Sequence, residues 1–159
     1  MGSDRVRKLP DTNVWVAMTI QSHQHNGVVI DWCQRQAENS LFMCRSTQQG
    51  LLRIITTEKV FGDDAATNAE ALGLLDKIRS LPFFGGFVID DLPLEERWFR
   101  YADRPTRSPK MWMDAYLAAL SVELGAIMVT FDRGFLQYGG VAVELLRKDG
   151  DYVLTDVQV

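Results

Sequence analysis

The sequence has few cysteines, no long apolar run and no excess of positive charge, and each absence excludes a class of protein. Cys33 and Cys44 are too few for a disulfide scaffold and lack metal-cluster spacing, so we expect two buried free thiols. The apolar stretches are far shorter than the roughly 18–20 residues of a membrane span. The polar N-terminus, with Arg5, Arg7 and Lys8, lacks the apolar core of a signal peptide. We therefore predict a cytoplasmic protein without a membrane segment.

The chain is weakly acidic, with 21 acidic and 17 basic residues and a formal net charge of -4. This balance argues against binding nucleic acid through a broadly basic surface. It does not exclude a metal-dependent nuclease, which concentrates carboxylates in its active site. The length of 159 residues and the 47% hydrophobic content are those of one globular domain, which we predict to span residues 1–159.

Short apolar runs alternate with longer helical patterns along the chain. Turn residues bound the runs, which predict buried strands at 6–10, 41–44, 87–89, 126–131 and 141–146. Apolar residues at helical spacing predict helices at 28–38, 46–56, 64–79, 94–102 and 110–124. Strands that alternate with helices indicate an α/β fold with a parallel sheet covered on both faces.

Three aspartates lie where such a sheet would bind a ligand, beyond the carboxyl ends of its strands. Asp11 comes directly after the first predicted strand, and Asp132 comes directly after the strand at 126–131. Asp114 is near the start of the helix that leads into the strand at 126–131. We therefore expect the three side chains to converge on one rim of the sheet.

A cluster of carboxylates indicates a site for a hard divalent cation. Like charges close together raise one another's pKa, and a bound cation relieves that repulsion. Mg²⁺ and Mn²⁺ prefer oxygen ligands and can activate water for phosphodiester hydrolysis. Each aspartate also has a simpler interpretation, because an aspartate after a strand or at a helix start often caps or forms a turn.

Three segments resemble the motifs of PIN-domain ribonucleases. Residues 9–16 (LPDTNVWV) resemble the opening D-T-N signature, residues 113–120 (MDAYLAAL) the internal D-A motif, and residues 129–135 (VTFDRGF) the T-x-D motif at a strand end. They occur in the family's order and span nearly the whole chain. The length, and the segment TQQGLLR at 47–53, are most similar to VapC-type toxins of toxin–antitoxin systems.

The resemblance implies a PIN-like three-layer sandwich, with a central parallel sheet flanked by helices. It implies an endoribonuclease that depends on Mg²⁺ (or Mn²⁺) and hydrolyses RNA phosphodiester bonds. It further implies an RNA substrate, a homodimer, and a cognate antitoxin whose tail fills the acidic cleft.

Carried over residue by residue, the resemblance makes Asp11, Asp114 and Asp132 the catalytic carboxylates that bind the metal. Asn13 is expected to orient Asp11 or a metal-bound water, and Thr130 to supply a hydroxyl beside Asp132. The candidates for supporting the carboxylates or contacting substrate are Asn13, Thr47, Gln48, Arg53, Thr130 and Arg133.

One departure from the family pattern concerns the helix after the second strand, where many PIN nucleases carry a glutamate. This chain has Thr47 and Gln48 there, and no acid until Glu58. A water or an oxygen of these two side chains then replaces the carboxylate, or metal affinity falls. Arg133 and Arg53 suit phosphate because guanidinium binds oxygens in pairs, although Arg53 could equally form a salt bridge at the rim or with a partner subunit.

The missing glutamate leaves a second hypothesis open, a PIN-like module that binds RNA or protein without catalysis. A phosphatase with Asp11 as nucleophile ranks last, because such enzymes usually need a second acid two residues on and this chain has Asn13. His23 and His25 lie in a polar loop and are interpreted as residues of a helix entry or a substrate-side contact, and not as a metal pair. Trp112 could stack on an RNA base, although packing in a core or dimer face is the commoner role.

Overall fold

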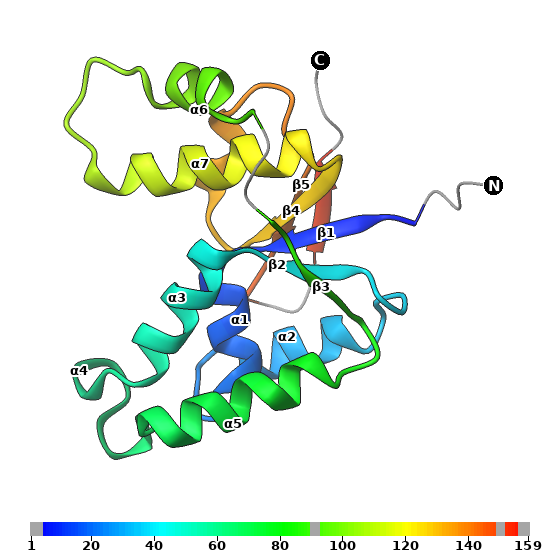
Figure 1. The fold of residues 1–159 in the computed structure, drawn as a ribbon, viewed down its shortest axis with the longest axis vertical. Helices are drawn as coiled ribbons and strands as arrows, with labels where there is room; N and C mark the ends of the chain where they lie inside the picture. Colours follow the sequence, from blue (N-terminus) through cyan, green and yellow to red (C-terminus); the bar gives the residue numbers. More distant parts are fainter. Residues whose placement is uncertain (1–4, 90–92, 149–151, 156–159) are drawn as a thin grey trace.

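The computed structural model describes residues 5–89 and 93–148, and the backbone of 152–155. A six-stranded sheet forms its centre, in the order β3-β2-β1-β4-β5-β6 (Figure 1). The strands are β1 (Arg7–Pro10), β2 (Leu41–Met43), β3 (Phe84–Phe87), β4 (Ala126–Thr130), β5 (Val143–Leu146) and β6 (Tyr152–Thr155). The first five pair in parallel, and β6 runs antiparallel to β5 at one edge.

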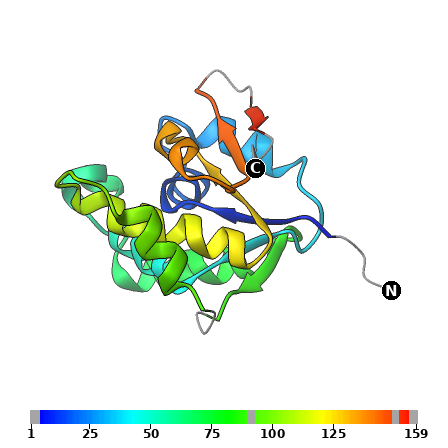
Figure 2. The ribbon, with the colours of Figure 1, turned by 90° about the horizontal axis from the view of Figure 1, so that it is seen from above.

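Helices cover both faces of the sheet, which confirms the predicted three-layer α/β arrangement. The helices are α1 (Thr12–Thr19), α2 (Asn26–Cys33), α3 (Arg45–Ile55), α4 (Glu58–Phe61), α5 (Asn68–Arg79), α6 (Glu95–Ala102) and α7 (Pro109–Glu123). Two short 3₁₀ helices are η1 (Gly62–Asp64) and η2 (Arg133–Gln137). Figures 1 and 2 show α6 and α7 on one side of the sheet, and α1, α2, α3 and α5 on the other.

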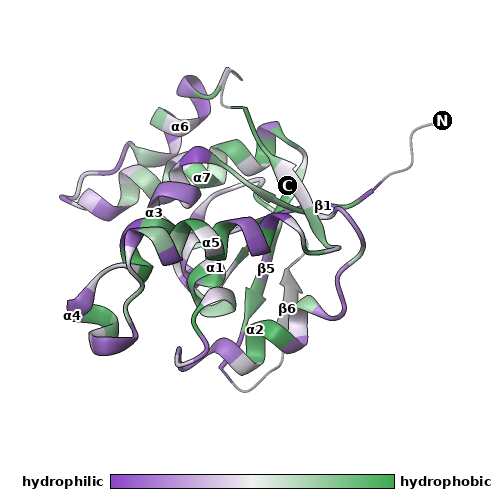
Figure 3. Ribbon diagram, turned by 60° about the horizontal axis from the view of Figure 1, so that its bottom comes forward, coloured by the Kyte–Doolittle hydropathy of each residue, from purple (hydrophilic) through white to green (hydrophobic). Residues whose placement is uncertain are grey.

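Each face of the sheet has its own apolar core. One core packs α1, α2, α3 and α5 around Trp15 and Trp32, both almost fully buried. The other packs α6 and α7 around Leu120, Met128 and Phe135. In Figure 3 hydrophobic colour runs along β5, between the layers, and hydrophilic colour marks outer turns such as those near α4. Burial of apolar area on both faces supplies the main driving force for this fold.

The structure differs from the expected elements at α1 and β3. The sequence pattern does not predict α1, because Val14 to Met18 are all buried and the helix has no polar face to give a helical period. The predicted strand at 87–89 is wrong in position, because β3 begins at Phe84 and includes Gly85. A Cβ on Gly85 would lie 2.6 Å from the Asn39 carbonyl oxygen, so this strand position accepts only glycine.

Both cysteines are buried thiols, and neither forms a disulfide with a described residue, as predicted. Among the described residues, no helix is both long enough and apolar enough to cross a membrane.

Candidate active site

The adjacent ends of β1 and β4 bring two of the three aspartates to one rim. Pro10 pairs with Val129, and the Asp11 backbone N–H donates to the Val129 carbonyl at 2.8 Å. One residue further along, the Thr130 hydroxyl donates to Asp11 Oδ2 at 3.1 Å. Because parallel strands end at the same edge, residues 119 positions apart become neighbours.

Asp11 is buried, and the hydrogen bonds of its carboxylate with the described residues come from neutral donors. It is the N-cap of α1, where its Oδ1 accepts from the Thr12 backbone N–H at 2.7 Å. Asp11 therefore does cap a helix, as the simpler interpretation predicted. Among the described residues, its Oδ2 then accepts from the Thr130 hydroxyl. The pKa of Asp11 is raised to about 6, mainly by burial and to a smaller extent by the nearby Asp114 carboxylate. The hydrogen bonds from Thr12 and Thr130 act in the opposite direction and lower it.

Asp132 begins the turn that follows β4. Its backbone N–H donates to the Thr130 hydroxyl at 2.9 Å, and its Oδ1 accepts from the Gly134 N–H at 2.8 Å. Thr130 therefore links Asp11 and Asp132 through one hydroxyl group, which donates to one and accepts from the other. A Cβ on Gly134 would lie 2.9 Å from Asp132 Oδ1, so glycine permits this tight turn.

Asp114 reaches the same rim from the second turn of α7. Its carboxylate is half-buried, and burial raises its pKa, while Lys110 lowers it and the Asp132 charge raises it. Asp114 raises the pKa of Asp11, Asp132 raises that of Asp114, and the Lys110 ammonium lies near both Asp114 and Asp132, so the three carboxylates belong to one region of the rim. Among the described residues, however, they do not come close enough together for all three to hold one metal ion, as the sequence had led us to expect.

Lys110 is the residue at this site that the sequence analysis missed. Its Nζ forms an ion pair with Asp132 Oδ2 and lies 3.6 Å from Asp114 Oδ2. The ion pair lowers the pKa of Asp132 and raises that of Lys110. The available signal was its position four residues before Asp114 on one helix, a spacing that places both side chains on the same face.

The chemistry of these donors fits a hard divalent cation, whereas their spacing fits the ammonium of Lys110. Among the described residues, no three His, Cys, Asp or Glu side chains lie close enough together to hold a metal ion. The ammonium of Lys110 is the cation that Asp114 and Asp132 share, and it also acts electrostatically on Asp11. The carboxylates of Asp11, Asp114 and Asp132 offer oxygen donors, which Mg²⁺ and Mn²⁺ prefer.

A comparison with protein-family models matches the PIN domain over residues 8–141. The chain belongs to the PIN-domain family. It is 38% identical to Ribonuclease VapC41 of Mycobacterium tuberculosis over 148 residues. The aligned region covers 88% of this chain and 99% of the relative. Ribonuclease VapC38 of the same organism is 31% identical over 129 residues, covering 79% and 85%. The similarity places this PIN domain with the VapC type.

Two solved structures share the fold of this PIN domain, both with a TM-score of 0.56. The crystal structure of PAE2754 from Pyrobaculum aerophilum is 24% identical and covers 90% of this chain and 86% of that one. VapC20 from Mycobacterium tuberculosis, a toxin that cleaves the sarcin–ricin loop, is 15% identical and covers 80% and 92%.

Of the remaining predicted site residues of this PIN domain, Asn13 and Arg133 lie next to the aspartates along the chain, whereas Arg53 lies elsewhere on α3. Asn13 is exposed on the first turn of α1, and the described hydrogen bonds of Asp11 do not include it. Arg133 is exposed at the start of η2, one residue after Asp132. Arg53 lies farther along α3, where it lines a surface pocket with residues of α5.

The start of α3 occupies the position of the missing glutamate. Thr47 is fully buried, and its hydroxyl is engaged with the Cys44 backbone N–H and carbonyl, as part of the helix cap. Gln48 accepts from Arg45 Nη1. A Cβ on Gly50 would lie 2.8 Å from the Thr12 side chain, so this glycine lets α3 approach the residue that follows Asp11.

His23 and His25 lie in a loop at the PIN-domain rim. The His25 ring stacks on Phe131, the residue before Asp132, with ring centroids 4.8 Å apart. His23 packs against His25 and accepts from its backbone N–H through Nδ1. This loop therefore borders the site, without joining the carboxylate cluster.

Proposed function

We propose that this PIN domain is a divalent-metal-dependent endoribonuclease of the VapC type, which hydrolyses RNA phosphodiester bonds. The observation that carries the proposal is the convergence of Asp11, Asp114 and Asp132 at the carboxyl ends of β1 and β4. The identity to Ribonuclease VapC41 supports the choice of RNA as substrate.

In this proposal the three carboxylates hold Mg²⁺ or Mn²⁺. When bound, such an ion supplies an activated water and stabilises negative charge on the phosphate. Thr130 fixes Oδ2 of Asp11 and the backbone of Asp132 through one hydroxyl, which keeps both carboxylates on the rim. The Thr12 backbone N–H donates to Oδ1 of Asp11, and the Gly134 backbone N–H donates to Oδ1 of Asp132.

Lys110 has two roles in this proposal. Its side chain is 69% exposed and pairs with two carboxylates, so it compensates their charge in the absence of another cation. Because an exposed lysine is flexible and its ion pairs are weak, the ammonium can turn to a phosphate oxygen of the RNA. Arg133, exposed beside Asp132, is proposed to contact the same strand.

The preferred substrate is unpaired RNA, because splayed bases can be reached in single strands and loops. A homodimer and a cognate antitoxin that covers the acidic rim are proposed from the similarity to VapC proteins. Asn13, Thr47, Gln48 and Arg53 are proposed as supporting residues, with Thr47 acting through the cap that positions α3.

The decisive experiment compares RNA cleavage by the wild type and Asp11→Asn, with Mg²⁺ and with a chelator. We expect cleavage only by the wild type with metal, and a loss of at least about 100-fold in the variant, because even residues that merely support metal ligands typically contribute 10–100-fold. Asp76→Asn, which neutralises an exposed aspartate on α5, is the matched control. Equal cleavage by Asp11→Asn and the wild type would refute the proposal.

A binding module without catalysis is the second candidate. The observation that favours it is that Lys110, and not a compact set of ligands, neutralises Asp114 and Asp132. Calorimetric titration with Mn²⁺ separates the two candidates, because a degenerate site would bind no metal at millimolar concentration while RNA binding persists.

A further inference from the structure

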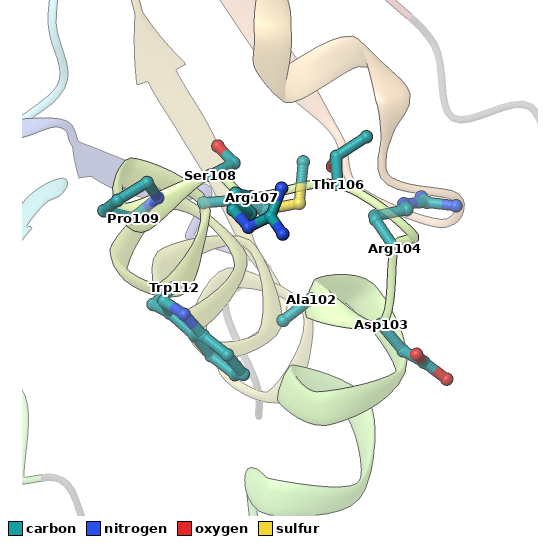
Figure 4. Close-up of a pocket in the computed structure, with 9 residues that line it drawn as sticks. Ala102, Asp103, Arg104, Thr106, Arg107, Ser108, Pro109 and Trp112 are labelled. Carbon is teal, nitrogen blue, oxygen red and sulfur yellow. The ribbon is translucent and has the colours of Figure 1, made fainter.

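A pocket of about 530 Å³ lies between the end of α6, the loop that follows it and the first turn of α7 (Figure 4). This volume is within the roughly 300–1,000 Å³ typical of small-ligand sites. The lining includes two arginines, a tryptophan and a serine: Arg104, Arg107, Trp112 and Ser108. None of these residues belongs to the carboxylate site described above.

The pocket and the carboxylate site share the N-terminus of α7. Pro109 lines the pocket, and the next residue, Lys110, forms the ion pairs of the carboxylate site. The phenol of Tyr138 interacts electrostatically with Arg104 and also with Asp114. The pocket and the carboxylate site therefore lie at the same end of α7.

The two arginines give this region a local positive charge in an acidic chain. Both are exposed, and neither guanidinium forms an ion pair with any residue that the structure describes. The neighbouring Asp103 carboxylate points away from Arg107 (Figure 4). Unpaired guanidinium groups bind phosphate oxygens through paired hydrogen bonds.

Trp112 provides an aromatic surface at the same place. Its side chain is 55% exposed, although it is one of the largest apolar groups in the chain. The Trp98 indole N–H donates to the Trp112 carbonyl at 2.8 Å, which holds the backbone of α7 there. Trp98 itself packs against Phe99 and Tyr116, so only Trp112 presents its ring to the pocket.

We propose that this pocket binds one unpaired nucleotide of an RNA strand, with its base stacked on Trp112 and its phosphate held by Arg104 and Arg107. An aromatic ring beside cationic groups is the usual way to bind single strands without reading their sequence. The hydroxyl of Ser108 is placed to bind the ribose or a base edge. The inference rests on the proposed ribonuclease function and adds a subsite that selects unpaired RNA next to the cleaved bond.

The test measures binding of a labelled unpaired RNA by fluorescence anisotropy, in a chelator so that no strand is cleaved. Trp112→Leu should bind about tenfold more weakly, and Trp112→Phe should recover most of the affinity, because phenylalanine still stacks. The double variant Arg104→Gln/Arg107→Gln should also bind more weakly. The slope of log affinity against log salt should also become shallower by about 0.7, because the two arginines neutralise one phosphate.

Arg100→Gln is the matched control, because Arg100 is an exposed arginine of α6 outside the pocket. It should bind RNA as the wild type does. A perfectly paired RNA duplex should bind more weakly than the single strand, and its affinity should not depend on Trp112, since its bases are not available for stacking.

Cleavage by each protein with Mg²⁺, measured in parallel, separates this inference from the ribonuclease proposal. If the wild type cleaves RNA and Trp112→Leu binds RNA unchanged, the subsite is refuted and the ribonuclease stands. If binding depends on Trp112 but the wild type cleaves no RNA, the subsite stands and the ribonuclease is refuted. If no unpaired RNA binds in the chelator, or if Trp112 is needed to bind a glutamate-rich peptide and not RNA, the subsite is refuted, and the cleavage assay alone decides the ribonuclease.

Discussion

Two buried carboxylates of the same sheet have opposite surroundings. Glu144, on β5, is 3% exposed and forms an ion pair with Lys8 of β1 at 2.9 Å. The Trp32 indole N–H also donates to it at 3.2 Å. Asp11, at the end of β1, is 9% exposed, and within the described part of the chain its carboxylate accepts from the Thr12 N–H and the Thr130 hydroxyl without an ion pair.

The difference indicates which carboxylate is available for chemistry. Burial of a charge is costly unless a counter-ion lies beside it, and the fold supplies one to Glu144. At Asp11 it supplies neutral donors and the neighbouring carboxylate Asp114, which raises the pKa. The first arrangement is structural, and the second leaves room for a cation from solution.

The largest expected effect concerns the paired carboxylate. Lys8→Met leaves Glu144 charged and buried without its cation, so the free energy of unfolding should fall by about 3 kcal/mol, at the lower end for a broken buried pair. Urea denaturation at neutral pH measures this change. Adding Glu144→Gln should recover part of the loss, because no buried charge is then left. Unchanged stability of Lys8→Met would show that Glu144 does not depend on its ion pair.

The next effect concerns Asp11, where a substitution should raise the free energy of unfolding and not lower it. The pKa of Asp11 is about 6 in the folded protein and 3.8 in its ordinary state, so the folded state binds the proton more tightly. This contribution to stability is complete below about pH 4 and is lost as the pH rises through 6. Without metal, Asp11→Asn should therefore be more stable than the wild type at pH 8, by about 2–3 kcal/mol.

The same two proteins should converge in stability near pH 3, below the ordinary pKa of 3.8, where Asp11 is mostly protonated in both folded and unfolded states. Asparagine is also a good N-cap, so the substitution keeps the start of α1 intact. Asp76→Asn removes the same charge from an exposed site and should show no such pH dependence. A stability difference between wild type and Asp11→Asn that is independent of pH would contradict the assignment of this effect to Asp11.

Short-range patterns were enough to find the three aspartates and the parallel sheet. Each of Asp11 and Asp132 follows a strand whose apolar run is visible in the sequence, and parallel topology brings such ends together. Lys110 was not found because its importance depends on a contact with Asp132, 22 residues away and on another element. Only the packing of α7 against β4 creates that contact.

Local patterns failed where packing removes the usual contrast between buried and exposed residues. The helix α1 is buried on nearly every side, so its apolar run has no helical period. In β3, Gly85 resembles a turn residue but lies in the strand, because the Phe42 ring and the Asn39 carbonyl occupy the space of a side chain. Both misassignments therefore have a tertiary cause.

The smallest expected effect tests whether Lys110 occupies the place of a metal ion. Lys110→Met removes an exposed ammonium that competes for Asp114 and Asp132, so Mn²⁺ should bind more tightly. An exposed ion pair contributes up to about 1 kcal/mol, so the gain should be about threefold to fivefold in affinity by calorimetry. The stability of the metal-free protein should change by less than about 1 kcal/mol, in contrast to Lys8→Met. Weaker Mn²⁺ binding by Lys110→Met would instead show that the lysine helps to assemble the site, because its ion pairs hold the two carboxylates together.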